Sequence, residues 1–186
     1  MLRKDFNLRP IEERDLELIL SWRNSERVRA CMYTDHVITL EEHWKWFKRV
    51  SQAEFSTVLV FEYQGVPAGL KNFSQIDRNN NRCYWGFYMG EAHVPRGCGT
   101  VMGFLALEYI LEQQNFRKLC AEVFAFNFES VKYHTRLGFV QEGFFVNHVI
   151  KNGEYLDIKS FAIFRDDWLK SKHLLQTKIF QPRDAV

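Results

Sequence analysis

The sequence lacks the features that mark a metal site, a disulfide framework or a membrane span. Its four cysteines, Cys31, Cys83, Cys98 and Cys120, are scattered and form no Cys-x-x-Cys pair, so neither zinc nor disulfides are indicated. No apolar run approaches the roughly 18 residues that a transmembrane helix needs. The opening segment MLRKDFNLRP has no apolar stretch of the kind found in signal peptides. We therefore expect a soluble, cytoplasmic protein without a bound metal.

Strong net charge is also missing. The 25 Lys and Arg side chains nearly balance the 23 Asp and Glu, which leaves a formal net charge of +2. A nucleic-acid-binding protein that relies on a broad basic face is thereby excluded. A local basic pocket for one anionic ligand stays compatible with this balance.

Apolar residues, in contrast, are plentiful. The 186 residues are 46% hydrophobic and include 17 Phe and 5 Trp, enough to bury a core without metal or disulfide support. Some of these rings are candidates for ligand contact. We expect one domain over residues 1–170, followed by a loosely held C-terminal tail over residues 171–186.

The first half of the chain predicts a strand, two helices and three strands in hairpin order. The strand is FNLRPI, and EERDLELILSWRN repeats apolar residues at helical spacing. Thr39 and Glu42 form a capping box at the start of the helical segment TLEEHWKWFKRV. The segments STVLVFEY, VPAGLKNFSQI and RCYWGFYMG then predict an antiparallel meander.

The second half alternates helix and strand and ends in a hairpin. A helix that runs to Gln113 is followed by the strand KLCAEVFAF and the helix ESVKYHTRLG, an order that implies a parallel strand pair. Asn152-Gly153 is the preferred pair for a type I′ turn and joins the last two strands. The elements together predict an α+β fold.

Two glycines stand one residue apart in PRGCGTVMGFLALEYIL, between a predicted strand and a predicted helix. The amides near Gly97, Cys98, Gly99 and Thr100 would converge where the helix dipole favours an anion such as a pyrophosphate. An ordinary glycine turn is the alternative. The spacing fits neither a Rossmann fingerprint nor a P-loop.

The order of elements and two motifs resemble the GCN5-related N-acetyltransferases, which transfer acetyl from acetyl-coenzyme A (acetyl-CoA) to amines. The segment VPRGCG is similar to the family's phosphate-binding pattern Gln/Arg-x-x-Gly-x-Gly/Ala, although Val94 replaces the polar first residue. The segment NFESVKYHTRLGF resembles the family's asparagine-led helix motif. The resemblance implies a mostly antiparallel, splayed central sheet of about seven strands flanked by about four helices.

The resemblance also implies acetyl-CoA as co-substrate and a set of residues that bind it. These are Val94, Arg96, Gly97, Cys98, Gly99, Thr100, Asn127 and Ser130. For Asn127, simple capping of the following helix is an equally weighted alternative.

Three residues are candidates for proton transfer. Counting seven residues from Asn127 places His134 where the family commonly has the tyrosine that protonates the departing thiolate, and a neutral imidazole still carries one N–H donor. Tyr133 is the alternative candidate for this role. Neighbouring helical residues point about 100° apart, so only one of the two side chains can reach the sulfur.

Glu122 lies on the preceding strand, where the family often uses a carboxylate that accepts the amine's proton through water. Strand alternation would place Glu122, Phe124 and Phe126 on one face. An ion pair with Arg117 or Lys118 is the alternative role for this glutamate.

The segment WRNSERVRACMYTDHVITLEEHWKWF resembles the nucleotide-sugar N-acetyltransferases of pseudaminic acid biosynthesis. Those enzymes acetylate the 4-amino group of a UDP-linked 4-amino-4,6-dideoxy sugar, by direct attack in a ternary complex. An arginine suits a diphosphate and an aromatic plane suits uracil. The match implies an acceptor site of Arg23, Met32, Tyr33, His43, Trp46 and Tyr84. Structural packing is the alternative for His43, and Trp44 is expected in the core.

Two other functions stay open. The segment LRPIEERDLELILSWRN also resembles the ribosomal-protein acetyltransferases, so the acceptor is alternatively a protein N-terminus, a polyamine or an antibiotic. A non-catalytic acyl-CoA sensor is a further alternative, since the family's tyrosine is missing. The expected partner is a small molecule, with no nucleic acid and no membrane, and the sequence is compatible with a homodimer.

Overall fold

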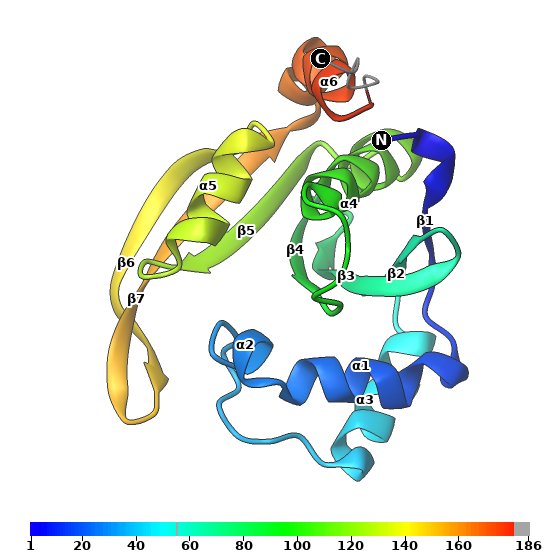
Figure 1. The fold of residues 1–186 in the computed structure, drawn as a ribbon. Coiled ribbons are helices and arrows are strands. Elements are labelled where there is room, and N and C mark those ends of the chain that lie inside the picture. The colour runs from blue at the N-terminus through cyan, green and yellow to red at the C-terminus, as the bar shows by residue number, and fades with distance from the viewer. Residues whose placement is uncertain (55, 181–186) are drawn as a thin grey trace.

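In the part of the chain that the structure describes, seven strands form one mixed sheet in the order β1-β2-β3-β4-β5-β7-β6 (Figure 1). The computed structural model describes residues 1–54 and 56–180. The strands are β1 Phe6–Pro10, β2 Thr57–Tyr63, β3 Val66–Asp77, β4 Arg82–Met89, β5 Lys118–Phe124, β6 Val140–Lys151 and β7 Glu154–Phe164. The α-helices are α1 Leu16–Asn24, α2 Glu26–Arg29, α3 Leu40–Gln52, α4 Cys98–Leu107, α5 Phe128–Arg136 and α6 Arg165–Phe180.

Short turns of other helix types complete these elements. Two 3₁₀ turns, Arg3–Asp5 and Glu13–Asp15, precede β1 and α1. A π-helical segment, Glu108–Gln113, continues α4.

The strands β4 and β5 are parallel neighbours that pair only at one end. Arg82, Cys83 and Tyr84 of β4 face Lys118, Leu119 and Cys120 of β5. Beyond these pairs β4 runs on to Met89 and β5 to Phe124, and the two strands diverge in Figure 1. The other neighbouring strands in the described sheet are antiparallel.

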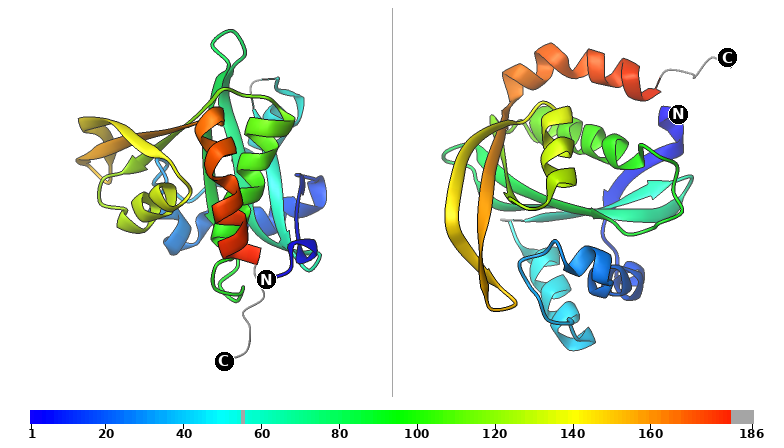
Figure 2. Two further views of the ribbon diagram at one scale, coloured as in Figure 1. Left: turned by 90° about the horizontal axis from the view of Figure 1, so that it is seen from above. Right: turned by 60° about the vertical axis from the view of Figure 1, so that its left-hand side comes forward.

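Helices cover both faces of the sheet. Figure 2 shows α1, α2 and α3 on one side, and α4, α5 and α6 on the other, with α6 alongside α4. The helix α4 is apolar all round its circumference, as expected for a helix buried between a sheet and another helix. A smaller cluster, in which Ile19 and Trp22 of α1 meet Val60 of β2, holds the opposite layer.

The predicted α+β fold and the local signals of the sequence are confirmed. Thr39 Oγ1 accepts a hydrogen bond from the Glu42 amide at 3.2 Å, and Glu42 Oε2 accepts one from the Thr39 amide at 2.7 Å, so the capping box starts α3. Asn152 and Gly153 have φ angles of 51° and 84°, as a type I′ turn requires. The meander β2-β3-β4 and the parallel pair β4-β5 are also present.

Two helices were not expected from the sequence, α2 and α6. Residues 171–180 belong to α6, so the expected loose tail is wrong for this segment. Trp168 is fully buried, and its Nε1 donates to Glu112 Oε1 at 2.8 Å, while Ile179 packs in the core near the other end. The rest of the expected tail, residues 181–186, lies outside the described residues.

None of the helices in residues 1–54 and 56–180 combines the length and the apolar character that a bilayer span requires.

Lys71 on β3 is the most unusual residue of the core. Its side chain has 0% exposure, and Nζ finds no hydrogen-bond partner within the described part of the chain. The nitrogen instead lies 2.9 Å from the centre of the Trp85 ring and 4.4 Å from that of Phe87. Burial lowers the pKa of Lys71 well below its usual value, because a charged ammonium would lose its hydration.

We expect Lys71→Met to raise the free energy of unfolding at pH 7 by about 1–3 kcal/mol, because a buried amine without a partner is replaced by an apolar chain. Burial lowers the native pKa of Lys71 well below its ordinary value of 10.5, so between these two values the unfolded chain carries a proton on Lys71 that the native chain lacks. Stability of the wild type therefore rises with pH, and the advantage of the variant shrinks towards pH 10.

Urea unfolding at pH 7 and pH 9.5 measures this effect. Lys45→Met, at an exposed site on α3, is the matched control and should show no such pH dependence. A loss of stability in Lys71→Met at both pH values would mean that Lys71 is charged and bound to the ring faces.

Candidate functional site

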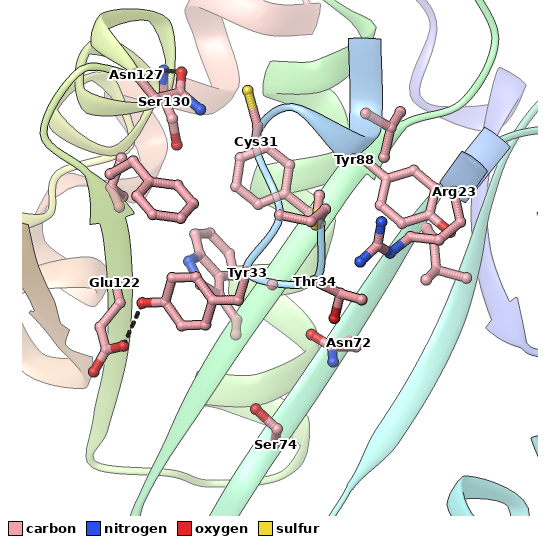
Figure 3. A pocket seen from close by; sticks show the side chains of 18 of the residues that line it. Arg23, Cys31, Tyr33, Thr34, Asn72, Ser74, Tyr88, Glu122, Asn127 and Ser130 are labelled. Atoms are coloured by element: carbon pink, nitrogen blue, oxygen red, sulfur yellow. Dashed lines mark hydrogen bonds between the residues drawn. The ribbon is translucent and has the colours of Figure 1, made fainter. Parts of the chain in front are cut away.

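The diverging ends of β4 and β5 open onto a cavity of about 810 Å³ (Figure 3). Its walls come from α1, α3, the loop between α2 and α3, the central strands and the first turns of α5. Many of the predicted site residues meet here. They are Arg23, Met32, Tyr33, His43, Trp46, Tyr84, Gly99, Glu122, Asn127, Ser130, Tyr133 and His134.

The loop between α2 and α3 is fastened at several points, which sets the positions of Met32 and Tyr33. The side-chain amide of Asn24 donates from Nδ2 to the Ile38 carbonyl and accepts at Oδ1 from the Ile38 amide, both at 2.8 Å. Lys151, nearly buried at the end of β6, donates from Nζ to the Met32 carbonyl at 2.8 Å. The loop is thus held between α1 and the β6-β7 hairpin.

Tyr33 and Glu122 form a pair across the cavity. The Tyr33 hydroxyl donates to Glu122 Oε2 at 2.6 Å (Figure 3). The Tyr33 ring also packs edge-on against Phe124, with ring centres 5.2 Å apart. Burial and this hydrogen bond raise the pKa of Tyr33, so the hydroxyl keeps its proton at neutral pH. Glu122 and Phe124 share one face of β5, as alternation predicts.

Arg23 lies at the other end of the drawn site, next to Tyr88 (Figure 3). One terminal nitrogen of its guanidinium, Nη1, is buried and has no partner among the described residues. Burial lowers the pKa of Arg23, although arginine stays protonated in proteins. A buried cation without a counterion is a ready contact for an anionic ligand.

His43 and Trp46 stack on each other on α3, with ring centres 4.9 Å apart. His43 is 4% exposed, and burial lowers its pKa, so it is neutral. Trp46 lines the cavity and also packs on the α1 cluster, whereas Trp44, expected in the core, contacts Phe47 outside the two core clusters. The contact of His43 and Trp46 with an acceptor stays a prediction.

The glycine loop places two free amides at the start of α4. Gly97 has a φ angle of 103°, which favours glycine, and turns the chain into the helix. The amides of Cys98 and Thr100 already donate to the carbonyls of Pro95 and Gly97. Only Gly97 and Gly99 among the four expected donors therefore keep an amide with no acceptor in residues 1–54 and 56–180.

The expected coenzyme residues of this loop separate into three groups. Gly99 lines the large cavity, while Arg96, Gly97 and Thr100 line a second cavity of about 520 Å³. The Cys98 side chain is 1% exposed and Val94 packs against the core. The structure therefore does not support ligand contact by the side chains of Cys98 and Val94, because both are engaged in packing.

Asn127 caps α5, as one of its two predicted roles requires. Its Oδ1 accepts a hydrogen bond from the Ser130 amide at 3.1 Å. The Nδ2 group has no acceptor in the described part of the chain and lies at the cavity wall. Capping and ligand contact are therefore compatible for this residue.

His134 has both ring nitrogens engaged, which does not fit its predicted role as general acid. Trp85 Nε1, which only donates, lies 3.0 Å from His134 Nε2, so Nε2 is an acceptor. Nδ1 lies 2.7 Å from the Ser130 carbonyl and donates to it. Burial lowers the pKa of His134 to about 4, so the ring is neutral and holds its proton away from the cavity.

Tyr133 lies closer to the glycine loop. Its hydroxyl donates to the Gly99 carbonyl at 3.1 Å, and this approach requires Gly103, because a Cβ there would collide with the hydroxyl. Burial raises the pKa of Tyr133, so it is protonated at neutral pH. Tyr133 and His134 each donate to a backbone carbonyl, but the Tyr133 hydroxyl makes one hydrogen bond in the described part of the chain, whereas both His134 nitrogens are engaged.

Sequence reasoning missed several polar residues of the cavity. Thr34, Asn72 and Ser74 lie between the Arg23 and Glu122 ends in Figure 3, and Arg27 and Arg49 add positive charge. Period-two alternation on β3 could have indicated that Asn72 and Ser74 share a face. Nothing in the local sequence could have shown that this face meets a loop around Thr34.

Comparison with known proteins assigns the family. The model of the acetyltransferase (GNAT) domain matches residues 8–159. Spermidine N(1)-acetyltransferase of Escherichia coli K12 is 24% identical over 162 residues, which cover 87% of each chain. The alanine N-acetyltransferase of ribosomal protein uS5 from the same organism is 27% identical over 101 residues, 54% of this chain and 52% of the relative.

Solved structures share the fold. Spermidine N-acetyltransferase of Vibrio cholerae, in complex with CoA and spermine, superimposes with a TM-score of 0.83 at 22% identity. The match covers 89% of this chain and 99% of that protein. The expected family and sheet architecture are thus confirmed, whereas the resemblance to pseudaminic acid enzymes finds no support among these relatives.

We expect the stability of the chain to fall on the acid side because of His134. Below its ordinary pKa of 6.5 the unfolded chain gains a proton on this ring, and the native chain does not until about pH 4. Over that window the wild type should lose about 2–3 kcal/mol relative to His134→Gln.

Urea unfolding at pH 7 and pH 4.5 measures the difference between the two proteins. His173→Gln, at an exposed histidine of α6, is the control and should track the wild type. A difference between wild type and His134→Gln that is the same at both pH values would show that native His134 titrates normally.

Proposed function

The chain belongs to the GNAT acetyltransferase family, and we propose that it transfers the acetyl group of acetyl-CoA to the amine of a small acceptor. The observation that carries this proposal is the pair of free amides, Gly97 and Gly99, beside the gap between β4 and β5. The cavity that opens from this gap also holds groups able to bind and deprotonate an amine.

The residues present fit the coenzyme. The free amides at the positive end of α4 suit a diphosphate, and the free Nδ2 of Asn127 suits a carbonyl of the pantetheine arm. The unpaired edges of β4 and β5 beyond Tyr84 and Cys120 offer further backbone donors and acceptors. When bound, the thioester supplies an activated acetyl group.

Glu122 and Tyr33 are suited to handle the proton of the acceptor. An amine reacts only when neutral, and Glu122 is a carboxylate that already accepts a hydrogen bond from a protonated phenol. Tyr33 orients this carboxylate by holding Oε2, which leaves Oε1 for the amine or for a bridging water. We assign Glu122 as the proton acceptor and Tyr33 as the residue that positions it.

Tyr133 is the better donor of a proton to the thiolate. Its side chain lines the large cavity and its hydroxyl makes a single hydrogen bond in the described part of the chain, to the Gly99 carbonyl at 3.1 Å, whereas both ring nitrogens of His134 are engaged. His134 instead fixes the Trp85 ring through Nε2. We therefore propose Tyr133 as the acid and His134 as a positioning residue, which reverses the expectation from the motif count.

The arginines of the cavity suit an anionic, ring-bearing acceptor. Arg23, Arg27 and Arg49 line it, and Arg23 has a buried nitrogen without a partner. Three carboxylates line it as well: Glu129 pairs with Lys132, whereas Glu42 and Glu122 accept hydrogen bonds from the neutral hydroxyls of Thr39 and Tyr33, which do not cancel a charge. A diphosphate at Arg23 and an aromatic surface at Trp46 or Tyr33 suit a UDP-linked 4-amino sugar.

A polyamine is the second candidate acceptor. The matched relatives act on spermidine or on a ribosomal protein, which favours a small amine over a nucleotide sugar. The arginines of the cavity oppose this, whereas Glu42 and Glu122 offer a polycation two carboxylates that no Lys or Arg of the described residues pairs with. A non-catalytic sensor, the third candidate, would bind acetyl-CoA without transferring its acetyl group.

That the chain forms a homodimer stays a prediction.

We expect a mass-spectrometric assay with acetyl-CoA to show acetylation of a UDP-4-amino-4,6-dideoxy sugar in preference to spermidine and to an alanine-terminated peptide. Arg23→Gln should raise the KM for the sugar about 10- to 100-fold, because a charge-assisted contact is lost. The KM for acetyl-CoA should stay unchanged.

Arg14→Gln, at an exposed arginine paired with Glu12, is the control variant. Preferred acetylation of spermidine would establish the second candidate. Coenzyme binding without acetylation of any of the three amines would support the sensor.

We expect Tyr133→Phe to lower kcat about 100-fold with little change in KM, because general acid catalysis is worth roughly that much. His134→Gln should retain more of its turnover, since Gln keeps polar groups near Trp85 and Ser130. Saturating steady-state kinetics at pH 7.5 compare the two. Collapse of turnover in His134→Gln together with an active Tyr133→Phe enzyme would return the acid role to His134.

A further inference from the structure

The second cavity lies on the other side of the glycine loop from the large one. Gly99 lines the large cavity, whereas Gly97 and Thr100 line the second, which measures about 520 Å³. A molecule whose diphosphate is bound at this loop would have one arm in each cavity. The large cavity takes the reactive arm, so the second is placed to take the nucleotide.

Three cations from three different elements surround the second cavity. Arg96 precedes α4, Arg136 ends α5 and Lys178 lies in the last turn of α6. All three are exposed, and none forms an ion pair with an acidic side chain in the described ranges. Within residues 1–54 and 56–180 no carboxylate lines the cavity, so these three charges have no acidic partner there.

Helix α6 forms one wall of this cavity and is firmly placed. Ser171, Leu174, Leu175 and Lys178 recur at a spacing of three and four residues, so they share one face of the helix. Trp168 packs edge-on against Phe104 of α4 at 5.3 Å and anchors this face. Figure 2 shows α6 along α4, with the N-terminus near its end.

We propose that the second cavity binds the nucleotide end of coenzyme A and that Lys178 and Arg136 bind its ribose phosphate monoester. Coenzyme A carries this dianionic group in addition to the diphosphate linker, and two cations near it match its charge. The apolar side chains of Leu174 and Leu175 offer a surface for the adenine ring. The C-terminal helix is thereby a part of the coenzyme site, an inference that rests on the proposed function.

Calorimetric titration with CoA and with dephospho-CoA, which lacks only the monoester, tests this inference. We expect the wild type to bind CoA about tenfold more tightly than dephospho-CoA, since contacts to a charged group are worth about that factor. Lys178→Gln should reduce this ratio about threefold or more, and Lys178→Gln with Arg136→Gln should bring it near one. Binding of dephospho-CoA should hardly change.

Lys170→Gln is the matched control, because Lys170 lies on α6 and pairs with Asp167 away from the cavity. Thermal melting of each variant checks the fold. A ratio near one in the wild type, or equal weakening of both ligands by Lys178→Gln, would overturn the inference and leave the proposed function intact. Absence of binding by either nucleotide would overturn both.

Discussion

The site depends on one constraint of the sheet, the short pairing of β4 with β5. Three residue pairs, from Arg82–Lys118 to Tyr84–Cys120, hold the strands together before they separate. Continued pairing would satisfy the backbone and leave no gap. The separation leaves unpaired strand edges, brings the Gly97–Gly99 amides beside them, and sets Glu122 opposite Tyr33.

Burial keeps Tyr133 and His134 neutral at neutral pH, and their hydrogen bonds fix where their protons lie. Trp85 connects His134 with Lys71, since it donates to His134 and presents its ring face to Lys71. His134 is a poor acid because both of its ring nitrogens are engaged, whereas the Tyr133 hydroxyl makes a single hydrogen bond in the described part of the chain. Hydrogen bonding to distant residues therefore distinguishes the roles that we propose for these two neighbours on α5.

Much of the fold and part of the site follow from local sequence signals. Thr39 with Glu42 and Asn152 with Gly153 specify a helix start and a turn through contacts within three residues, so a linear pattern reveals them. The pairing of His134 with Trp85 spans 49 residues and that of Tyr33 with Glu122 spans 89. No spacing rule encodes such contacts. Counting along the motif therefore selected His134 as the acid without showing that Trp85 occupies its Nε2. The burial of Lys71 was not foreseen for the same reason.

A crystal structure of the chain with coenzyme A tests the central claim most directly. The account predicts the diphosphate within hydrogen-bond distance of the Gly97 and Gly99 amides and the thiol in the gap between β4 and β5. Coenzyme density that lies outside this gap, or that leaves both amides without a phosphate oxygen, would contradict it.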